Sequence, residues 1–142
     1  MVRISHHRDP LMLLMALALS ASLQVDCPPQ IESRQQLLSP TTGWQGVTRD
    51  WEGKPNQTLR HRLEALALFD GEPGELAQLK PDNGDSAETH YWSLTGDGAR
   101  PLYLVCHYQD SAISLQQPLP SGITYCRVNQ TDWGPSGLIC RK

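Results

Sequence analysis

The stretch Leu102–Leu119, LYLVCHYQDSAISLQQPL, carries the clearest structural pattern in the chain. Its apolar side chains alternate with other residues in two runs, first at Leu102, Leu104, Cys106 and Tyr108 and then at Ile113, Leu115 and, past polar Gln117, Leu119. A period of two places alternate side chains on the same face of a β-strand. The stretch therefore predicts two strands of a sheet with one buried face.

Sheet patterns also occur on both sides of this stretch. His90–Thr95 precedes it, and Ile123–Val128 and Leu138–Cys140 follow it. Counted with the earlier segments, they make six or seven short strands separated by turn residues, which is typical of an antiparallel meander. We therefore predict a mainly β fold, a sandwich or a partly closed barrel, with one short helical turn and two disulfides.

The run Leu59–Phe69 is compatible with two structures. A helix is favoured by the residue types Leu, Glu and Ala and by the spacing of Leu59, Leu63, Leu66 and Ala67. A strand would instead place Leu63, Ala65, Ala67 and Phe69 on one face and Leu66 and Leu68 on the other. We predict a strand, because the run ends in Phe-Asp-Gly, where Asp and Gly supply a turn. Residues 31–38 are left as either a strand or a short helix.

The turn that follows, within Phe69–Asp82, has the sequence FDGEPGELAQLKPD. Gly74–Leu79 predicts one short helical turn that places Leu76 and Leu79 on the core, and Pro81 ends it. The same segment carries three carboxylates and lies close in sequence to two aromatic residues. We predict that these five residues bind a partner with a basic cleft: Asp70, Glu72, Glu75, Tyr91 and Trp92. Paired carboxylates for glycoside hydrolysis, and acids that only favour a helix start, are the alternative interpretations.

The chain begins with the features of an export signal. Arg3 and Arg8 precede the apolar block Leu11–Leu19, which is followed by small residues. The block is shorter than the roughly 20 apolar residues of a membrane-spanning helix. We predict a cleaved signal peptide over residues 1–22, a single domain over residues 23–142, and no membrane association after cleavage.

The charge of the chain argues against nucleic acid as a partner. The formal net charge is −3, and cleavage after residue 22 would remove two arginines and one aspartate and leave −4. The remaining basic residues are scattered, whereas nucleic-acid binding needs a cluster of them.

All four cysteines, Cys27, Cys106, Cys126 and Cys140, lie in the predicted mature domain. An even number in a small exported chain predicts two disulfides, and the spacing lacks the close pairs of a zinc site. If a strand over Ile113–Leu115 separates Cys106 from Cys126 in a meander, those two lie roughly 9–10 Å apart, beyond disulfide reach. We therefore favour the pairs Cys27–Cys106 and Cys126–Cys140.

Motifs for catalysis and cofactors are lacking in the sequence. It contains no phosphate-binding loop, no Gly-x-Ser-x-Gly elbow and no His-Glu-x-x-His helix. The mature domain has three dispersed histidines, His61, His90 and His107, which is ordinary for its size. We predict a protein that is not an enzyme and that binds no cofactor or metal.

Several short motifs occur in the same order as in a family of small exported proteobacterial proteins, most of them uncharacterised. The motifs are Cys27-Pro28, Gly43-Trp44, the Phe-Asp-Gly-x-Pro-x-Glu turn of residues 69–75 with Leu79 and Pro81, the Cys-x-Tyr of residues 106–108, and Leu119-Pro120 before Cys126. The sequence resembles that family over most of its mature part. Some members behave as periplasmic immunity proteins against type VI secretion effectors that attack peptidoglycan, notably L,D-transpeptidase-like ones.

The resemblance therefore implies a periplasmic protein that binds a cognate effector and occludes its active site. It would be a monomer alone or a heterodimer with the effector. Two alternatives are kept: a periplasmic inhibitor of a foreign cell-wall hydrolase such as lysozyme, and a small secreted enzyme.

Overall fold

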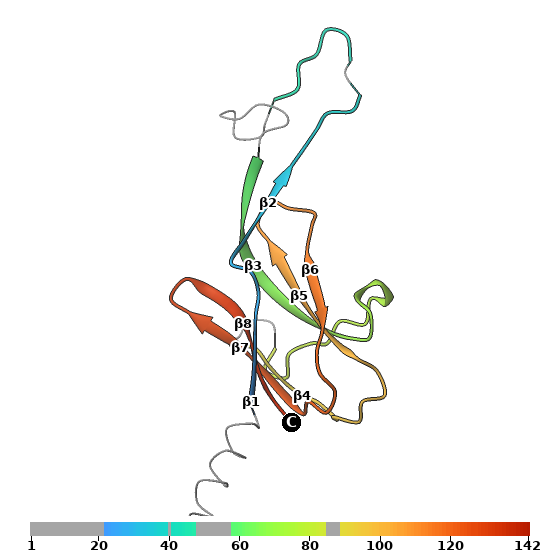
Figure 1. The fold of residues 1–142 in the computed structure, drawn as a ribbon, viewed down its shortest axis with the longest axis vertical. Helices are drawn as coiled ribbons and strands as arrows, with labels where there is room; N and C mark the ends of the chain where they lie inside the picture. Colours follow the sequence, from blue (N-terminus) through green and yellow to red (C-terminus); the bar gives the residue numbers. More distant parts are fainter. Residues whose placement is uncertain (1–21, 40, 48–57, 85–88) are drawn as a thin grey trace, which may run out of the picture.

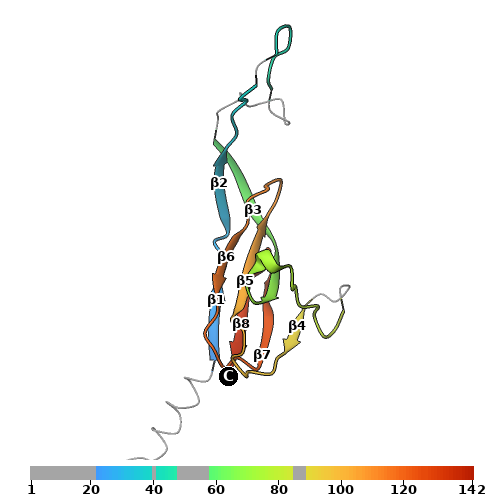
Figure 2. The ribbon, with the colours of Figure 1, turned by 90° about the vertical axis from the view of Figure 1, so that its right-hand side faces the viewer.

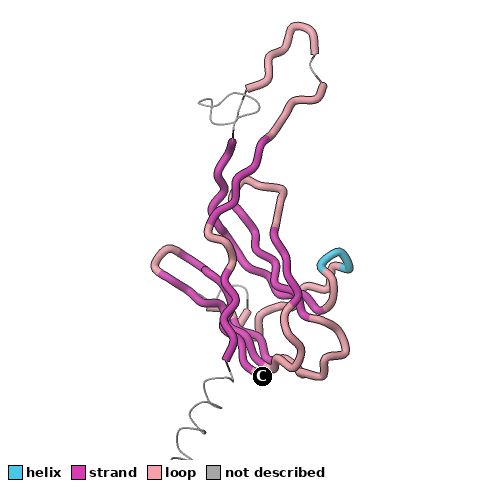
Figure 3. The backbone as a smooth tube through the Cα atoms, viewed as in Figure 1, coloured by secondary structure: helices cyan, strands magenta, loops and turns pink. Residues whose placement is uncertain are grey.

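The computed structural model of the protein describes residues 22–39, 41–47, 58–84 and 89–142. These residues form eight strands and one turn of 3-10 helix (Figures 1 and 3). The elements are β1 (Ser22–Asp26), β2 (Gln30–Arg34), β3 (Thr58–Asp70), η1 (Pro73–Glu75), β4 (Tyr91–Ser93), β5 (Leu102–Tyr108), β6 (Leu115–Pro118), β7 (Tyr125–Thr131) and β8 (Gly134–Arg141). Apart from Ser22, the predicted signal peptide lies outside the described residues. No helix in the described part is long and apolar enough to cross a membrane.

The strands form two four-stranded sheets, in the orders β1-β8-β7-β4 and β2-β3-β5-β6. Every pairing is antiparallel. The predicted mainly β class is confirmed, with eight strands where six or seven were expected. Residues 31–38, for which the sequence allowed a strand or a short helix, begin as a strand, since β2 covers the first part of that segment.

The order of the strands differs from the single meander that was assumed in predicting the disulfide pairs. β6 pairs with β5, but the next strand in the chain, β7, belongs to the other sheet. The crossing occurs in a tight turn in which Leu119 N–H donates to Leu102 O at 2.7 Å and Gly122 adopts a φ of 85°. A left-handed φ suits glycine, which has no Cβ to clash. The turn therefore directs the chain across the core instead of along the sheet.

β3 confirms the predicted strand and joins two parts of the molecule. Its first half pairs with β2, and its second half pairs with β5. A β-bulge between Leu63 and Ala65 shifts the alternation by one residue. Leu63 consequently packs on the main core together with Leu66, whereas Ala67 and Phe69 pack with Val105 on the opposite face. The prediction that Leu63, Ala67 and Phe69 share a face was wrong, because a period of two does not continue through a bulge.

The main core lies between the two sheets. Both sheets contribute side chains that are almost fully enclosed: Leu68, Leu104, Cys106 and Tyr108 from one, and Trp92, Cys126, Val128, Leu138 and Cys140 from the other. Figure 2 shows the two sheets edge-on, with the pair β2–β3 extending beyond the body that holds this core. The body therefore carries most of the hydrophobic stabilisation.

Both predicted disulfides are present, Cys27–Cys106 and Cys126–Cys140. Cys126 and Cys140 are direct partners on β7 and β8, with their Cα atoms 4.1 Å apart. Cys27 lies where the chain leaves one sheet and enters the other, and its bridge holds this crossing against β5. The pairing is as predicted, although Cys106 and Cys126 are kept apart by belonging to different sheets and not by an intervening strand.

A buried tyrosine reinforces the same crossing. The hydroxyl of Tyr108 donates to the Pro28 carbonyl oxygen at 2.7 Å, and the side chain is almost completely buried. Burial raises the pKa of the Tyr108 phenol, because the charged form would lose its hydration. The hydrogen bond and the neighbouring disulfide together anchor the N-terminal arm.

Candidate partner-binding site

The turn that follows β3 projects from the body beside the start of β5 (Figure 3). Its helical part is only the three residues Pro73–Glu75, and it ends at Leu76, which has a left-handed φ of 65°. Leu79 packs against the core as predicted, but Leu76 is 83% exposed. The prediction for Leu76 was wrong because the helical turn ends before Leu79, so the two leucines do not share a helical face.

Two of the three carboxylates of this turn are held by one arginine. Arg100 forms an ion pair and hydrogen bond with Glu75, and its Nε lies 3.9 Å from Asp70 Oδ1. The hydrogen bond and the negative charge of Glu75 raise the pKa of the Arg100 guanidinium. The third acid, Glu72, is exposed immediately before the helical turn. The turn therefore displays its acids in a defined arrangement and keeps a net negative charge.

Gly71 allows the arginine to take this position. It has a φ of 88°, and a Cβ at this residue would overlap the guanidinium of Arg100. We expect Gly71→Ala to lower the free energy of unfolding by about 1–2 kcal/mol, because an L-residue is strained at this φ. It should also displace the Arg100 side chain from Glu75. Urea denaturation measures the first effect.

Gly74→Ala is the matched control for this substitution. Gly74 lies in the same turn, has no left-handed φ, and has open space around the position of a Cβ. We expect its free energy of unfolding to stay within about 0.5 kcal/mol of the parent protein. Equal losses for both variants would contradict a special role for Gly71.

The two aromatic residues predicted to bind a partner point in opposite directions. Trp92 is 3% exposed, and its indole N–H donates to the Leu79 carbonyl oxygen at 3.0 Å. Tyr91 lies on the outer face of β4 and stacks on Tyr125, with ring centroids 6.0 Å apart. Trp92 therefore supports the turn from inside, and only Tyr91 presents its ring to the surface.

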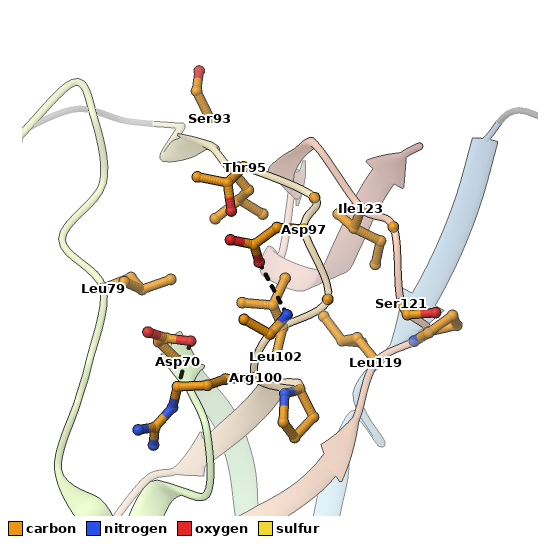
Figure 4. Close-up of a pocket in the computed structure, with 17 residues that line it drawn as sticks. Asp70, Leu79, Ser93, Thr95, Asp97, Arg100, Leu102, Leu119, Ser121 and Ile123 are labelled. Atoms are coloured by element: carbon orange, nitrogen blue, oxygen red, sulfur yellow. Dashed lines mark hydrogen bonds and ion pairs between the residues drawn. The ribbon is translucent and has the colours of Figure 1, made fainter.

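An open cavity of about 520 Å³ connects the acidic turn to β4 (Figure 4). Asp70 and Leu79 line it from the turn, and the segments 93–102 and 119–123 complete the wall. Leu119 and Ile123 belong to the buried core, so the floor is apolar. Figure 4 shows the Asp70 carboxylate paired with Arg100 and the Asp97 carboxylate hydrogen-bonded within its own loop. The cavity thus combines an apolar floor with an acidic rim, in which the two carboxylates outnumber the one guanidinium of Arg100.

Sequence reasoning did not identify Asp97, Arg100 and Ser121 as part of this site. Asp97 lies in a loop whose Gly96 and Gly98 both have left-handed φ angles, and it accepts a hydrogen bond from Ala99 N–H at 3.0 Å. The run TGDGARP, residues 95–101, contained the turn residues that indicate such a loop. Nothing in the sequence indicated that the loop meets the acidic turn.

The histidines make ordinary structural contacts. His61 is buried, with Nε2 2.6 Å from Ser33 Oγ and Nδ1 2.8 Å from the Gln109 carbonyl oxygen. His107 Nδ1 lies 2.8 Å from Ser114 Oγ. Neither histidine lines the cavity beside the acidic turn. Among the described residues, no group of three or more His, Cys, Asp or Glu side chains could hold a metal ion.

Comparison with known protein families identifies one match. The family described as "Type VI secretion system Tli immunity protein" matches residues 54–141, which include β3 to β8, the acidic turn and the cavity. The chain belongs to this family. Comparisons with curated proteins and with solved structures give no match.

Membership makes this chain a type VI secretion immunity protein, and an immunity protein acts on a cognate effector. It confirms the immunity family suspected from the sequence motifs. The two disulfides fit a periplasmic or exported protein, because such bonds persist in oxidising compartments.

Proposed function

We propose that this protein works in the periplasm as a non-enzymatic inhibitor that binds its effector and occludes the effector's active site. The acidic turn and the adjoining cavity are the contact surface in this proposal. The partner-binding residues are Asp70, Glu72, Glu75 and Tyr91, with Trp92 holding Tyr91 and Leu79 in place from the core. Family membership is the observation that carries the proposal.

The geometry of the turn supports a binding role. A binding surface gains affinity when its groups are ordered before the partner arrives. Arg100 orders Asp70 and Glu75, and the Trp92 hydrogen bond orders the backbone at Leu79. The apolar floor of the cavity then offers a place for a side chain of the partner. The acidic rim favours a partner with a basic surface around its active site.

The effector in this proposal is a peptidoglycan-targeting enzyme of the L,D-transpeptidase-like kind. This part rests on the resemblance of the sequence motifs to immunity proteins of that class. Some members of the family that the motifs resemble are encoded beside such effectors. The test is therefore to direct the exported toxin encoded by the neighbouring gene to the periplasm, with and without the immunity protein. We expect lysis and altered wall fragments only without it, and a complex of the two purified proteins on size exclusion. A toxin that leaves peptidoglycan unchanged would contradict the choice of target.

Charge reversal tests the acidic turn directly. We expect Glu72→Lys/Glu75→Lys to weaken the complex with the effector about tenfold or more, because two attractive charges at the contact become repulsive. The thermal melt should fall only modestly, because both side chains are exposed and the lost ion pair between Glu75 and Arg100 contributes little at a surface. Isothermal titration calorimetry and a melt on the same samples measure both quantities.

Glu64→Lys/Asp132→Lys is the matched control. Both residues are exposed, lie outside the turn and the cavity, and give the same change in charge. We expect this control to bind the effector much more tightly than the variant at the turn. If both variants lose affinity equally, the turn has no specific role and only the overall charge matters.

A further inference from the structure

The outer face of the sheet β1-β8-β7-β4 carries a row of tyrosine and arginine side chains. Tyr91 on β4 is the direct partner of Arg127 on β7, and Tyr125 on β7 is the direct partner of Arg141 on β8. Direct partners in an antiparallel pair lie on the same face. Since Trp92, Cys126 and Cys140 point into the core, these four residues point outward. We call Tyr91, Tyr125, Arg127 and Arg141 the tyrosine–arginine face.

Contacts within this face hold its aromatic rings in place. The rings of Tyr91 and Tyr125 stack with an interplanar angle of 27°, and the guanidinium of Arg141 lies 4.4 Å from the centroid of the Tyr125 ring. The strands beneath them are joined by the Cys126–Cys140 disulfide. Ordered aromatic groups lose little conformational freedom on binding, which favours their use as anchors in an interface.

The two arginines of the face are not neutralised by carboxylates. In the part of the chain that the structure describes, the arginines with a carboxylate oxygen within 4 Å are Arg60 and Arg100. The acids beside this sheet are engaged elsewhere: Asp26 on β1 accepts a hydrogen bond from Gln24 and lies across β8. Asp82 lies beside β4, and its carboxylate accepts a hydrogen bond from the Ser93 N–H. The protein as a whole is acidic, with a formal net charge of −3. The face is therefore a local basic patch on an acidic protein.

We propose that the tyrosine–arginine face binds an acidic segment of the effector. Carboxylates of that segment pair with Arg127 and Arg141, and its apolar side chains pack on Tyr91 and Tyr125. Charge complementarity selects an acidic partner, and planar guanidinium groups suit carboxylates because they bind them through two parallel hydrogen bonds. Two arginines are too few for a nucleic-acid backbone. The identity of the partner rests on the proposed function.

The face adjoins the acidic turn through β4. Ser93 is the direct partner of Tyr125 and also lines the cavity. An effector that covers both areas would meet an acidic rim and a basic face side by side. Such an alternation fixes the orientation of the complex and rejects partners with the opposite charge order.

The experiment compares Arg127→Glu/Arg141→Glu with the control Arg34→Glu/Arg62→Glu, which removes two exposed arginines from the β2–β3 pair. We expect Arg127→Glu/Arg141→Glu to bind the effector about tenfold or more weakly, and its affinity to depend less on salt concentration. The control variant should change the affinity and its salt dependence much less. Arg127→Gln/Arg141→Gln should give a smaller loss, and thermal melts check that each variant is folded. If Arg127→Glu/Arg141→Glu and the control variant bind the effector equally well, the proposal is overturned.

A second arm needs no effector. The disulfide-bonded protein is titrated by NMR with a short peptide of alternating glutamate and phenylalanine, and with the same peptide carrying lysine for glutamate. We expect the acidic peptide alone to shift the amides of the tyrosine–arginine face, and Arg127→Glu/Arg141→Glu to abolish the shifts. Absent shifts, or shifts elsewhere, overturn the proposal. A toxin that forms no complex with the parent protein refutes the proposed function instead, and the peptide result still decides the chemistry of the face.

Discussion

Replacing Cys27 and Cys106 together by alanine should lower the free energy of unfolding by about 4.5 kcal/mol. The bridge closes a loop between residues 79 positions apart, so its loss frees a long segment of the unfolded chain. It also releases the point where the chain crosses between the sheets. Urea denaturation of the purified variant without reductant measures the change.

The second bridge is the control for this result. Cys126–Cys140 spans only 14 positions and joins strands that are already paired. The same entropic argument gives about 3 kcal/mol for its loss. We therefore expect the Cys27/Cys106 variant to be the less stable of the two. The reverse order would show that local strain or native contacts, and not loop length, decide the contribution of each bridge.

Leu68→Ala should cost about 2–5 kcal/mol of stability, because it opens a cavity in a closed core. Leu68 has no exposed surface, and it belongs to the cluster that both sheets build. Little backbone movement is available to fill the space, since β3 is paired to β5 on one side and also contacts β8. Chemical denaturation monitored by tryptophan fluorescence measures the loss, because Trp92 lies in the same cluster.

Leu76→Ala makes the same chemical change at a surface position. Leu76 is 83% exposed at the end of the 3-10 turn, so its truncation should change the stability by less than about 0.5 kcal/mol. A large loss in this variant would mean that Leu76 packs on the core, as its spacing from Leu79 first suggested. If effector affinity falls while stability is kept, Leu76 extends the proposed contact surface beyond the carboxylates.

The strands could be predicted where one face is buried and the other is exposed. The first part of β7 and the last part of β8 were visible because the main core lies on one side of these strands. β5 was visible through the alternation of its core-facing residues, although Val105 is also buried on its other face. β3 was harder, because it packs on both faces in its second half and contains a bulge. A bulge inserts one residue, and its position depends on the partner strand and not on local sequence.

The candidate site was only partly visible in the sequence. The acids of the turn were found, since three carboxylates next to Gly and Pro stand out. Asp97 and Arg100 were missed because their loop is distant from the turn in the chain: Arg100 lies 25 positions from its partner Glu75. Tyr91 and Trp92 are neighbours in one strand, so only one of them can point outward, but local sequence does not say which.

The amino-acid sequence alone was enough to predict a mainly β fold with two disulfides, and its motifs indicated an immunity family. These properties follow from local periodicity, from the number of cysteines and from short motifs, all of which are read along the chain. The tertiary structure decided that the strands divide into two sheets, that Arg100 holds two of the acids, and that two tyrosines and two arginines form one face. These features depend on strand order and register, which arise from long-range packing between residues that are distant in sequence.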